Sequence, residues 1–306
     1  MERRGPFFLW AVLLLLATGT AIAEEALHVL EKKSVRVLYG AGGQTAAERI
    51  AELSPDLCRE LEAATGLKMD FRPTVFPVTS RDRFHRLGGE DGYVAFAIPV
   101  RNQVVMDLSR FERRPASFRS VLKHEYSHLL LNRHIPAGGL PRWLDEGLAQ
   151  YLCDGLSEYL PGRQQLNLGE ALAAGRVMSL SDLQTRFPTD AAGRQLAYEQ
   201  SRRIVGYMAR RFGDRFLTDL IDRLSDGMSV DRALRSVSGM ALADMEAEWR
   251  RHEASPLAWL GRLAGNLYGL LFFLAALATL IGFGRHRRRR RAYADDEDDA
   301  DEAAGE

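Results

Sequence analysis

The chain has little cysteine and no excess of either charge. Cys58 and Cys153 are the only cysteines among 306 residues, and they lie too far apart in sequence to predict contact. The sequence therefore leaves open whether they form a disulfide or are each a small buried apolar residue. Lys and Arg number 41, Asp and Glu also number 41, and residues 24–255 are balanced as well. A chain without a basic excess gives no reason to expect nucleic acid as a partner.

Two sequence signatures are also missing. The glycines at 40–43 lie between a predicted strand and a predicted helix, the order found in phosphate-binding loops. No Lys-Ser or Lys-Thr follows them, and their spacing fits neither nucleotide-binding fingerprint, so we interpret the segment as a turn. No internal repeat is visible, and the roughly 230 residues of 24–255 are long enough for one sizeable core, or for a small lobe beside a larger one.

The string His-Glu-Tyr-Ser-His at residues 124–128 is the most informative part of the sequence. In a helix, His124 and His128 lie one turn apart on the same face, with their Cβ atoms about 5–6 Å apart. Two imidazoles at that spacing can bind one Zn²⁺. Glu125 lies next to the first histidine, where a general base for a zinc-bound water is expected. The string predicts a zinc site that still needs a third ligand.

Two residues compete for the third position. His134 has the spacing of the pattern HExxHxxGxxH, but that pattern needs a glycine for a left-handed turn where this chain has Leu131. Glu146 lies in a helix predicted to begin near Arg142, after a segment rich in proline and glycine. Gly147, beside it, leaves room for the close approach of a second helix. We favour Glu146 and interpret His134 as a solvated residue at a helix C-terminus.

Two strings together resemble a known family. HEYSH at 124–128 and PRWLDEGLAQY at 141–151 look like the peptidase MA-like branch of the gluzincin metallopeptidases, in which Trp-x-x-Glu-Gly-x-Ala follows HExxH. Residues 197–213 and 241–252 are also similar to that group, so the resemblance covers roughly residues 95–252. It implies a zincin-like fold, Zn²⁺ as cofactor, Glu125 as the catalytic base, and three metal ligands, which are His124, His128 and Glu146.

The resemblance carries three further implications. Related gluzincins use a tyrosine on a later helix to stabilise the oxyanion, and Tyr198 is the matching catalytic candidate. Some gluzincins have a second carboxylate four residues after the glutamate ligand, as a partner for a ligating histidine, but this chain has Gln150 there. Zincins hold the substrate backbone along an edge strand, for which Gln103 to Leu108 is the candidate segment.

The two ends of the chain predict its location. Residues 1–23 combine a positive start, an apolar run and a small-residue exit, which is typical of a signal peptide; no cysteine follows the run, which argues against a lipoprotein anchor. Residues 263–284 contain no charge and are long enough to form a transmembrane helix. Residues 285–306 open with arginines and end in an acidic run, which predicts a cytoplasmic tail. The ectodomain, residues 24–255, is expected outside the cytoplasm on a single-pass C-terminal anchor, in a periplasmic or extracellular location.

The periodicity of the chain predicts an α+β fold with a small mixed β-sheet and a helical C-terminal lobe. The resemblance implies that this fold is zincin-like and that the helix carrying HEYSH is the active-site helix. Strands are expected at residues 34–39, 69–78 and 93–107, helices at 45–65 and 116–132, and a polar connection at 81–91. After residue 156 the pattern is almost entirely helical.

The sequence therefore predicts a membrane-tethered, zinc-dependent metallopeptidase. It would hydrolyse peptide bonds by Glu-assisted attack of a zinc-bound water, with a peptide or protein as its substrate partner. Two alternatives remain, a non-catalytic zinc-stabilised interaction module and a zinc hydrolase acting on a non-peptide amide. The presence of Glu125 argues against the module, since a structural zinc site needs no base and usually has four protein ligands. Cleavage preference and oligomeric state are not indicated.

Overall fold

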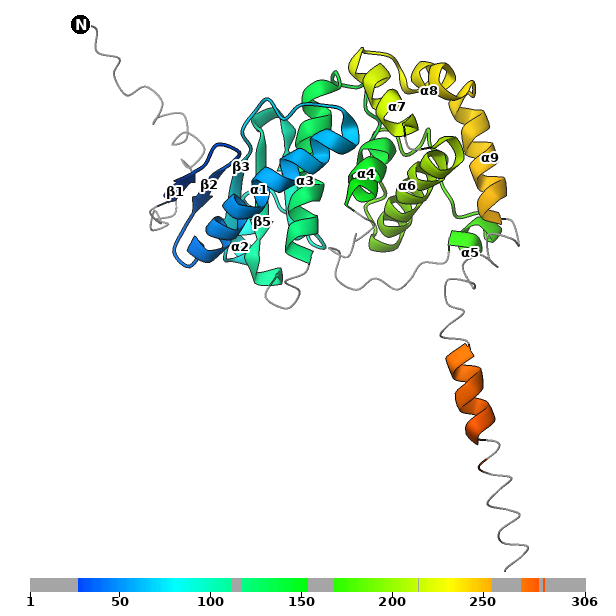
Figure 1. Cartoon of the computed structure of the whole chain (residues 1–306), viewed down its shortest axis with the longest axis horizontal. Coiled ribbons are helices and arrows are strands. Elements are labelled where there is room, and N and C mark those ends of the chain that lie inside the picture. Colours follow the sequence, from blue (N-terminus) through cyan, green and yellow to red (C-terminus); the bar gives the residue numbers. More distant parts are fainter. Residues whose placement is uncertain are drawn as a thin grey trace, which may run out of the picture.

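The computed structural model describes residues 27–111, 117–153, 168–213, 215–254, 271–280 and 283. Its main body has two halves, a β-sheet covered by helices and a bundle of helices, shown side by side in Figure 1. The first half comes from the N-terminal part of the chain and the second from the C-terminal part. This arrangement confirms the predicted α+β class with a helical C-terminal lobe.

The sheet has five strands and mixed direction. They are β1 (His28–Glu31), β2 (Arg36–Tyr39), β3 (Thr74–Val78), β4 (Ala95–Ile98) and β5 (Gln103–Asp107), arranged in the order β1-β2-β3-β5-β4. The three inner strands β2, β3 and β5 are parallel, whereas β1 and β4 pair antiparallel with their neighbours at the two edges. Parallel sheets are usually buried on both faces, and here helices pack on both faces of the sheet.

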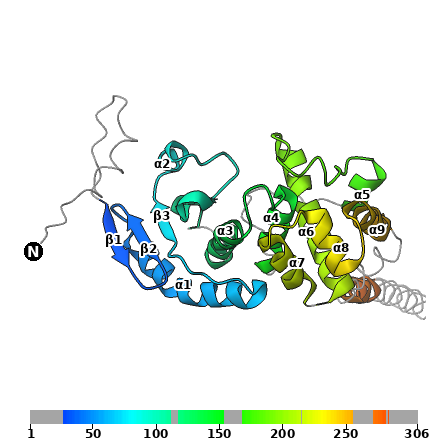
Figure 2. The same cartoon turned by 90° about the horizontal axis from the view of Figure 1, so that it is seen from above.

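Helices cover both faces of the sheet. Val75 and Val104 are completely buried in a core that they share with α1 (Gln44–Thr65) and α3 (Ser117–His134). Val105, whose side chain points to the opposite face because strand residues alternate, packs with Phe84 of α2 (Arg81–Arg86). Figure 2 shows α2 on the far side of the sheet from α1.

The helical half begins after α3. Its elements are α4 (Arg142–Leu152), α5 (Leu168–Ala173), α6 (Ala191–Phe212), α7 (Phe216–Ser225), α8 (Val230–Ser238) and α9 (Leu242–Ala254). Trp143 of α4 and Trp249 of α9 are completely buried in its core, together with Ile204 of α6. The two lobes therefore have separate cores.

Helix α3 belongs to both cores. Leu122 and Tyr126 pack in the core of the sheet, whereas Leu131 and the following Ile135 pack in the core of the helical lobe. The turns between these two ends of α3 lie at the junction of the lobes, and they carry the string at residues 124–128. The fold thus holds the two histidines at the boundary between its halves.

One prediction about the sheet was wrong. The segment from Gln103 to Leu108 was the candidate for the edge strand, but β5 is paired on both sides, with β3 and with β4. The edge strand on this side of the sheet is β4, because the chain between β4 and β5 turns back at the 3₁₀ turn Pro99–Arg101 and at Asn102, which takes a left-handed φ of 51°. The predicted strand at 93–107 is therefore a hairpin of two strands.

Other boundaries also differ from the predictions. Strand β1 was not predicted, because it is an exposed edge strand without the alternation of buried and polar residues that marks a half-buried strand. The strand predicted at 69–78 is confined to β3, Thr74–Val78, and the connection predicted at 81–91 contains the short helix α2. The helices predicted at 45–65 and 116–132 are confirmed as α1 and α3 within two residues at each end.

The cysteines and the terminal segments complete the comparison. No disulfide joins Cys58 and Cys153, and burial together with the charge of Glu62 raises the pKa of the Cys58 thiol to about 11. The predicted signal peptide, residues 1–23, and the predicted tail, residues 285–306, lie outside the described residues. In the predicted membrane span, residues 271–280 are described as helical and exposed. None of the helices within the described residues combines the length and the apolar character that a membrane span requires.

Candidate metal centre

Helix α3 presents two histidine rings to one point. His124 and His128 are one turn apart, and their Nε2 atoms lie 3.1 Å from each other. Both side chains are largely enclosed, with 4% and 12% of their surface exposed. The spacing that the sequence predicts for one metal ion is present in the fold.

Glu146 reaches the same point from α4. Its Oε2 atom lies 3.7 Å from His124 Nε2 and 3.5 Å from His128 Nε2. Helix α4 is fixed by close packing on α6, because a Cβ atom at Gly147 would come within 2.6 Å of the Ser201 carbonyl oxygen. The absence of a side chain at Gly147 therefore lets α4 approach α6, as predicted from the sequence.

The three donor atoms fit a zinc ion. Two imidazole nitrogens and a carboxylate oxygen are a donor set typical of catalytic zinc sites, and a tetrahedral ion with bonds of about 2.0–2.2 Å places its ligand atoms about 3.3–3.6 Å apart. The three separations in the structure are 3.1, 3.5 and 3.7 Å. Moreover, Glu146 Oε2 is a buried carboxylate oxygen without a hydrogen-bond partner, which a metal would satisfy. His124, His128 and Glu146 form a possible metal site.

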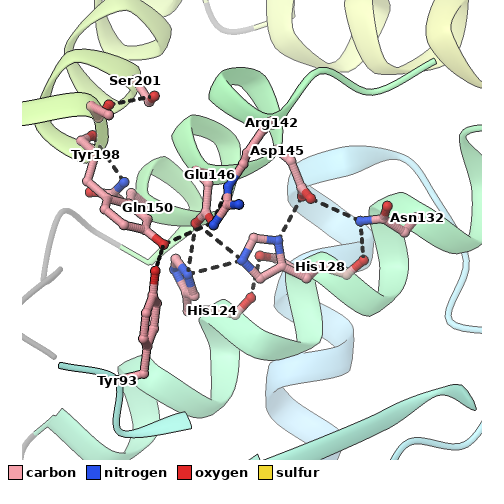
Figure 3. A network of polar contacts seen from close by, with 12 residues as sticks. Tyr93, His124, His128, Asn132, Arg142, Asp145, Glu146, Gln150, Tyr198 and Ser201 are labelled. Atoms are coloured by element: carbon pink, nitrogen blue, oxygen red, sulfur yellow. Dashed lines mark hydrogen bonds and ion pairs between the residues drawn. The ribbon is translucent and has the colours of Figure 1, made fainter. Parts of the chain in front are cut away.

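Asp145 orients one of the rings, a role that was not predicted from the sequence. His128 Nδ1 lies 2.7 Å from Asp145 Oδ1, and Asn132 Nδ2 donates to the other carboxylate oxygen at 3.1 Å (Figure 3). A carboxylate can only accept, so Nδ1 carries a proton, and Nε2, which faces Glu146, is the ring atom that can bind either a second proton or a metal ion. The partner expected four residues after Glu146 is therefore provided one residue before it. Gln150 instead donates to the backbone oxygen of Tyr198.

The electrostatics of the site favour a bound cation. Burial alone would raise the pKa of Glu146, but the imidazoles of His124 and His128 outweigh it and hold this pKa well below its usual range. Burial alone would lower the pKa of His128, but Asp145 and Glu146 outweigh it and raise this pKa well above its usual value. The carboxylates thus attract a positive charge to the Nε2 side of the ring, where a proton and a divalent cation compete.

Glu125 lies beside the histidines in an enclosed position. It is 3% exposed, and burial raises the pKa of its carboxyl group, an effect that the two neighbouring histidines oppose in part. A glutamate with a raised pKa can take up a proton and release it again closer to neutral pH, as a general acid–base group requires. The structure therefore encloses Glu125 next to the two histidines.

Tyr198 of α6 contacts Glu146 at the oxygen that does not face the histidines. It is 1% exposed, its ring packs edge-on against Phe187 with centroids 5.1 Å apart, and its hydroxyl donates to Glu146 Oε1 at 3.1 Å. Arg142 Nε lies 3.9 Å from the same oxygen. Glu146 Oε1 thus contacts Tyr198 and Arg142, while Oε2 faces the two histidines, as Figure 3 shows.

His134, the competing candidate, is engaged elsewhere. Helix α3 continues to this residue without the left-handed turn that would return it to the other histidines. Its Nε2 lies 2.7 Å from the backbone oxygen of Lys68. The structure brings Glu146, rather than His134, to His124 and His128.

Comparisons with known proteins place these residues in a family. The family model of the Peptidase MA superfamily matches residues 97–254, just over half of the chain. Among solved structures, the chain is similar to aminopeptidase A from Legionella pneumophila at 16% identity and a TM-score of 0.44, over 74% of this chain and 28% of that one. An M1 zinc metallopeptidase from Deinococcus radiodurans gives 18% identity and a TM-score of 0.42, over 74% and 51%.

The chain spans about half or less of the length of these two structures. No curated protein matches the chain. The region that the family model matches contains all three residues of the possible metal site, the adjacent Glu125 and the distant Tyr198. The resemblance found in the sequence is confirmed, and this chain belongs to the Peptidase MA superfamily.

Proposed function

We propose that this protein is a zinc-dependent metallopeptidase that hydrolyses peptide bonds. In this proposal His124, His128 and Glu146 bind Zn²⁺, and Glu125 is the general base. The observation that carries it is the buried Glu146 Oε2, which has no hydrogen-bond partner and lies within 3.7 Å of two imidazole nitrogens. Membership in the Peptidase MA superfamily supports the same reaction class.

The chemistry divides between the ion and the chain. Zn²⁺ bound by these ligands supplies a Lewis acid, which lowers the pKa of water and polarises a carbonyl group. Glu125 takes a proton from the attacking water and passes it to the leaving amine, for which its enclosed position and raised pKa are suited. Three protein ligands leave room for a fourth, which distinguishes a catalytic zinc site from a closed structural one.

Tyr198 is proposed as the hydrogen-bond donor to the substrate. Its hydroxyl lies 3.1 Å from Glu146 Oε1, at the edge of the metal site. Its proton can turn from that carboxylate toward the oxygen on which negative charge develops, as a donor of an oxyanion hole does. The packing of its ring on Phe187 limits the motion to the hydroxyl end.

Removal of the metal tests this proposal. The purified full chain should contain one zinc per molecule, measured by elemental analysis, and should cleave reduced, alkylated casein into fragments detected by mass spectrometry. Dialysis against a chelator should abolish cleavage and lower the Tm, because an ion that binds only the folded state stabilises it. One equivalent of Zn²⁺ should restore both properties.

The two alternative functions predict other results. One bound zinc without cleavage of casein or of any peptide in a mixed pool would favour a non-catalytic interaction module. Release of amine from a non-peptide amide, with peptides untouched, would favour the second alternative. A chain that binds no zinc at micromolar concentration would contradict all three.

We also propose that the catalytic lobe is tethered outside the cytoplasm by residues 263–284. The support is the uncharged run itself and the exposed apolar side chains of its described part, among them Phe272 at 79% and Phe273 at 63%. In sealed membrane vesicles of known orientation, added protease should digest residues 24–255 from the non-cytoplasmic side only. Digestion of this segment and of the C-terminal tail from the same side would contradict the proposed topology.

A further inference from the structure

A second tyrosine meets the site from the other lobe. Tyr93 lies between α2 and β4, in the sheet half of the protein and just before the residues that the family model matches. Its hydroxyl lies 3.2 Å from the hydroxyl of Tyr198, which lies 3.1 Å from Glu146 Oε1. Figure 3 shows the two phenols meeting end to end beside the metal ligands, one from each side.

The direction of these hydrogen bonds follows from counting protons. The carboxylate of Glu146 only accepts, so the single hydroxyl proton of Tyr198 is donated to it. At the contact between the two phenols, the oxygen of Tyr198 must then accept, and Tyr93 must donate. Hydrogen bonds in such a chain polarise one another, so the bond from Tyr93 makes Tyr198 a stronger donor.

The backbone of Tyr93 is held firmly in place. Arg81 Nη1 donates to the backbone oxygen of Tyr93 at 2.7 Å and to Asp107 Oδ2 at 3.1 Å. Asp107 is completely buried at the end of β5, so this anchor is tied to the sheet. A fixed backbone is what a residue needs if its side chain is to position another group.

The ring of Tyr93 is fixed as well. It packs against both main hydrophobic cores, and the guanidinium of Arg194 lies 5.3 Å from its centroid. Arg194 belongs to α6, one turn before Tyr198. Tyr93 thus contacts the same helix twice, through its ring and through its hydroxyl, and it links that helix to the sheet.

We propose that Tyr93 is a positioning residue of the catalytic site, whose hydroxyl fixes that of Tyr198 and strengthens it as a donor to the substrate's carbonyl oxygen. This inference rests on the proposed function. When the proton of Tyr198 turns from Glu146 to the substrate, the bond donated by Tyr93 is kept and stabilises the charge that develops on the phenol oxygen. The reaction then depends on one residue from each lobe.

A double-mutant cycle tests the inference. Tyr93→Phe keeps the ring and removes only the donor, so kcat for casein cleavage should fall about fivefold to tenfold, the size expected for one hydrogen bond, with KM changed less than about twofold. In a Tyr198→Phe background the same change should have no effect on kcat. Tyr207→Phe is the matched control, since its hydroxyl also donates to a carboxylate, that of Glu248 on the helical lobe, and kcat should not change.

A second measurement does not depend on activity. With carbon-13 at the phenol carbon of all nine tyrosines, the signal of Tyr198 is identified by its loss in Tyr198→Phe. Tyr93→Phe should shift this signal, and Tyr207→Phe should leave it in place. All variants are compared at a temperature at which circular dichroism shows them folded. A Tyr93→Phe chain that is unfolded at every temperature would mean that the Tyr93 hydroxyl is needed for folding, and it would overturn the inference.

The outcomes separate the two proposals. If the wild-type chain is active, three results would each overturn the role of Tyr93 alone. They are a Tyr198 signal that Tyr93→Phe does not shift, a kcat that Tyr93→Phe does not change, and equal losses of kcat from Tyr93→Phe in the wild-type and Tyr198→Phe backgrounds. A zinc-loaded wild-type chain that cleaves no peptide would overturn the proposed function, whatever the spectrum shows.

Discussion

Glu125→Gln should lower kcat for peptide cleavage about a thousandfold or more, with zinc content unchanged, because a positioned general base contributes roughly 10²–10⁴-fold. The amide has nearly the shape of the carboxylate but cannot accept a proton from water. Glu125 is buried beside two proposed ligands without being one of them, so the metal site should be intact. Steady-state kinetics and elemental analysis on the same preparation measure both quantities.

Stability gives this prediction an internal control. Burial raises the pKa of Glu125 in the folded, metal-free chain above its value in the unfolded chain, so this residue lowers the stability of the fold at every pH above the unfolded-state pKa, neutral pH included. A neutral amide removes that cost, and metal-free Glu125→Gln should melt at or above the Tm of the wild type. Glu253→Gln, a buried glutamate of α9, is the matched variant and should keep full activity. A Glu125→Gln chain with more than a tenth of wild-type kcat would show that another group is the base.

Parts of the site could be predicted because local geometry determines them. A helix alone brings His124 and His128 to one face, and their Nε2 atoms lie 3.1 Å apart as that spacing suggests. Glu146 follows within one short connection, and Gly147 indicates a close helix contact that the structure places against Ser201. The active-site helix and the site residues that depend on it therefore needed little knowledge of the complete fold.

Other contacts depend on the tertiary fold and could not be predicted. Asp145 was not predicted because the family motif contains Glu146 and not the acidic residue before it. Its contact with His128 Nδ1 depends on how α4 packs against α3, which the sequence alone does not give. Tyr93 meets Tyr198 across 105 residues, and no local pattern contains that pairing. The edge of the sheet was assigned to the wrong strand because the apolar pattern of residues 93–107 does not reveal the reversal at Asn102.

Glu146→Gln should weaken zinc binding about a thousandfold. Structural zinc sites in proteins have binding free energies of roughly 10–16 kcal/mol. Glu146 is the one anionic ligand among the three proposed, so its loss removes a substantial part of the binding free energy. The amide oxygen occupies the same place but carries no charge, and it leaves the imidazoles of His124 and His128 without the carboxylate that faces them at 3.5–3.7 Å. Competition with a chromophoric chelator measures the affinity directly, without reference to any substrate.

Asp145→Asn is the graded control for Glu146→Gln, since it removes a neighbouring charge on the same helix. Asp145 contacts the Nδ1 side of His128 rather than the metal position, and partners of this kind typically contribute 10–100-fold to affinity. Zinc affinity should therefore fall in the order wild type, Asp145→Asn, Glu146→Gln. Equal losses in the two variants would mean that Glu146 orients the rings as Asp145 does, and wild-type affinity in Glu146→Gln would remove it from the ligand set. In either case two histidines would lack a protein carboxylate, and the proposed three-ligand centre would be wrong.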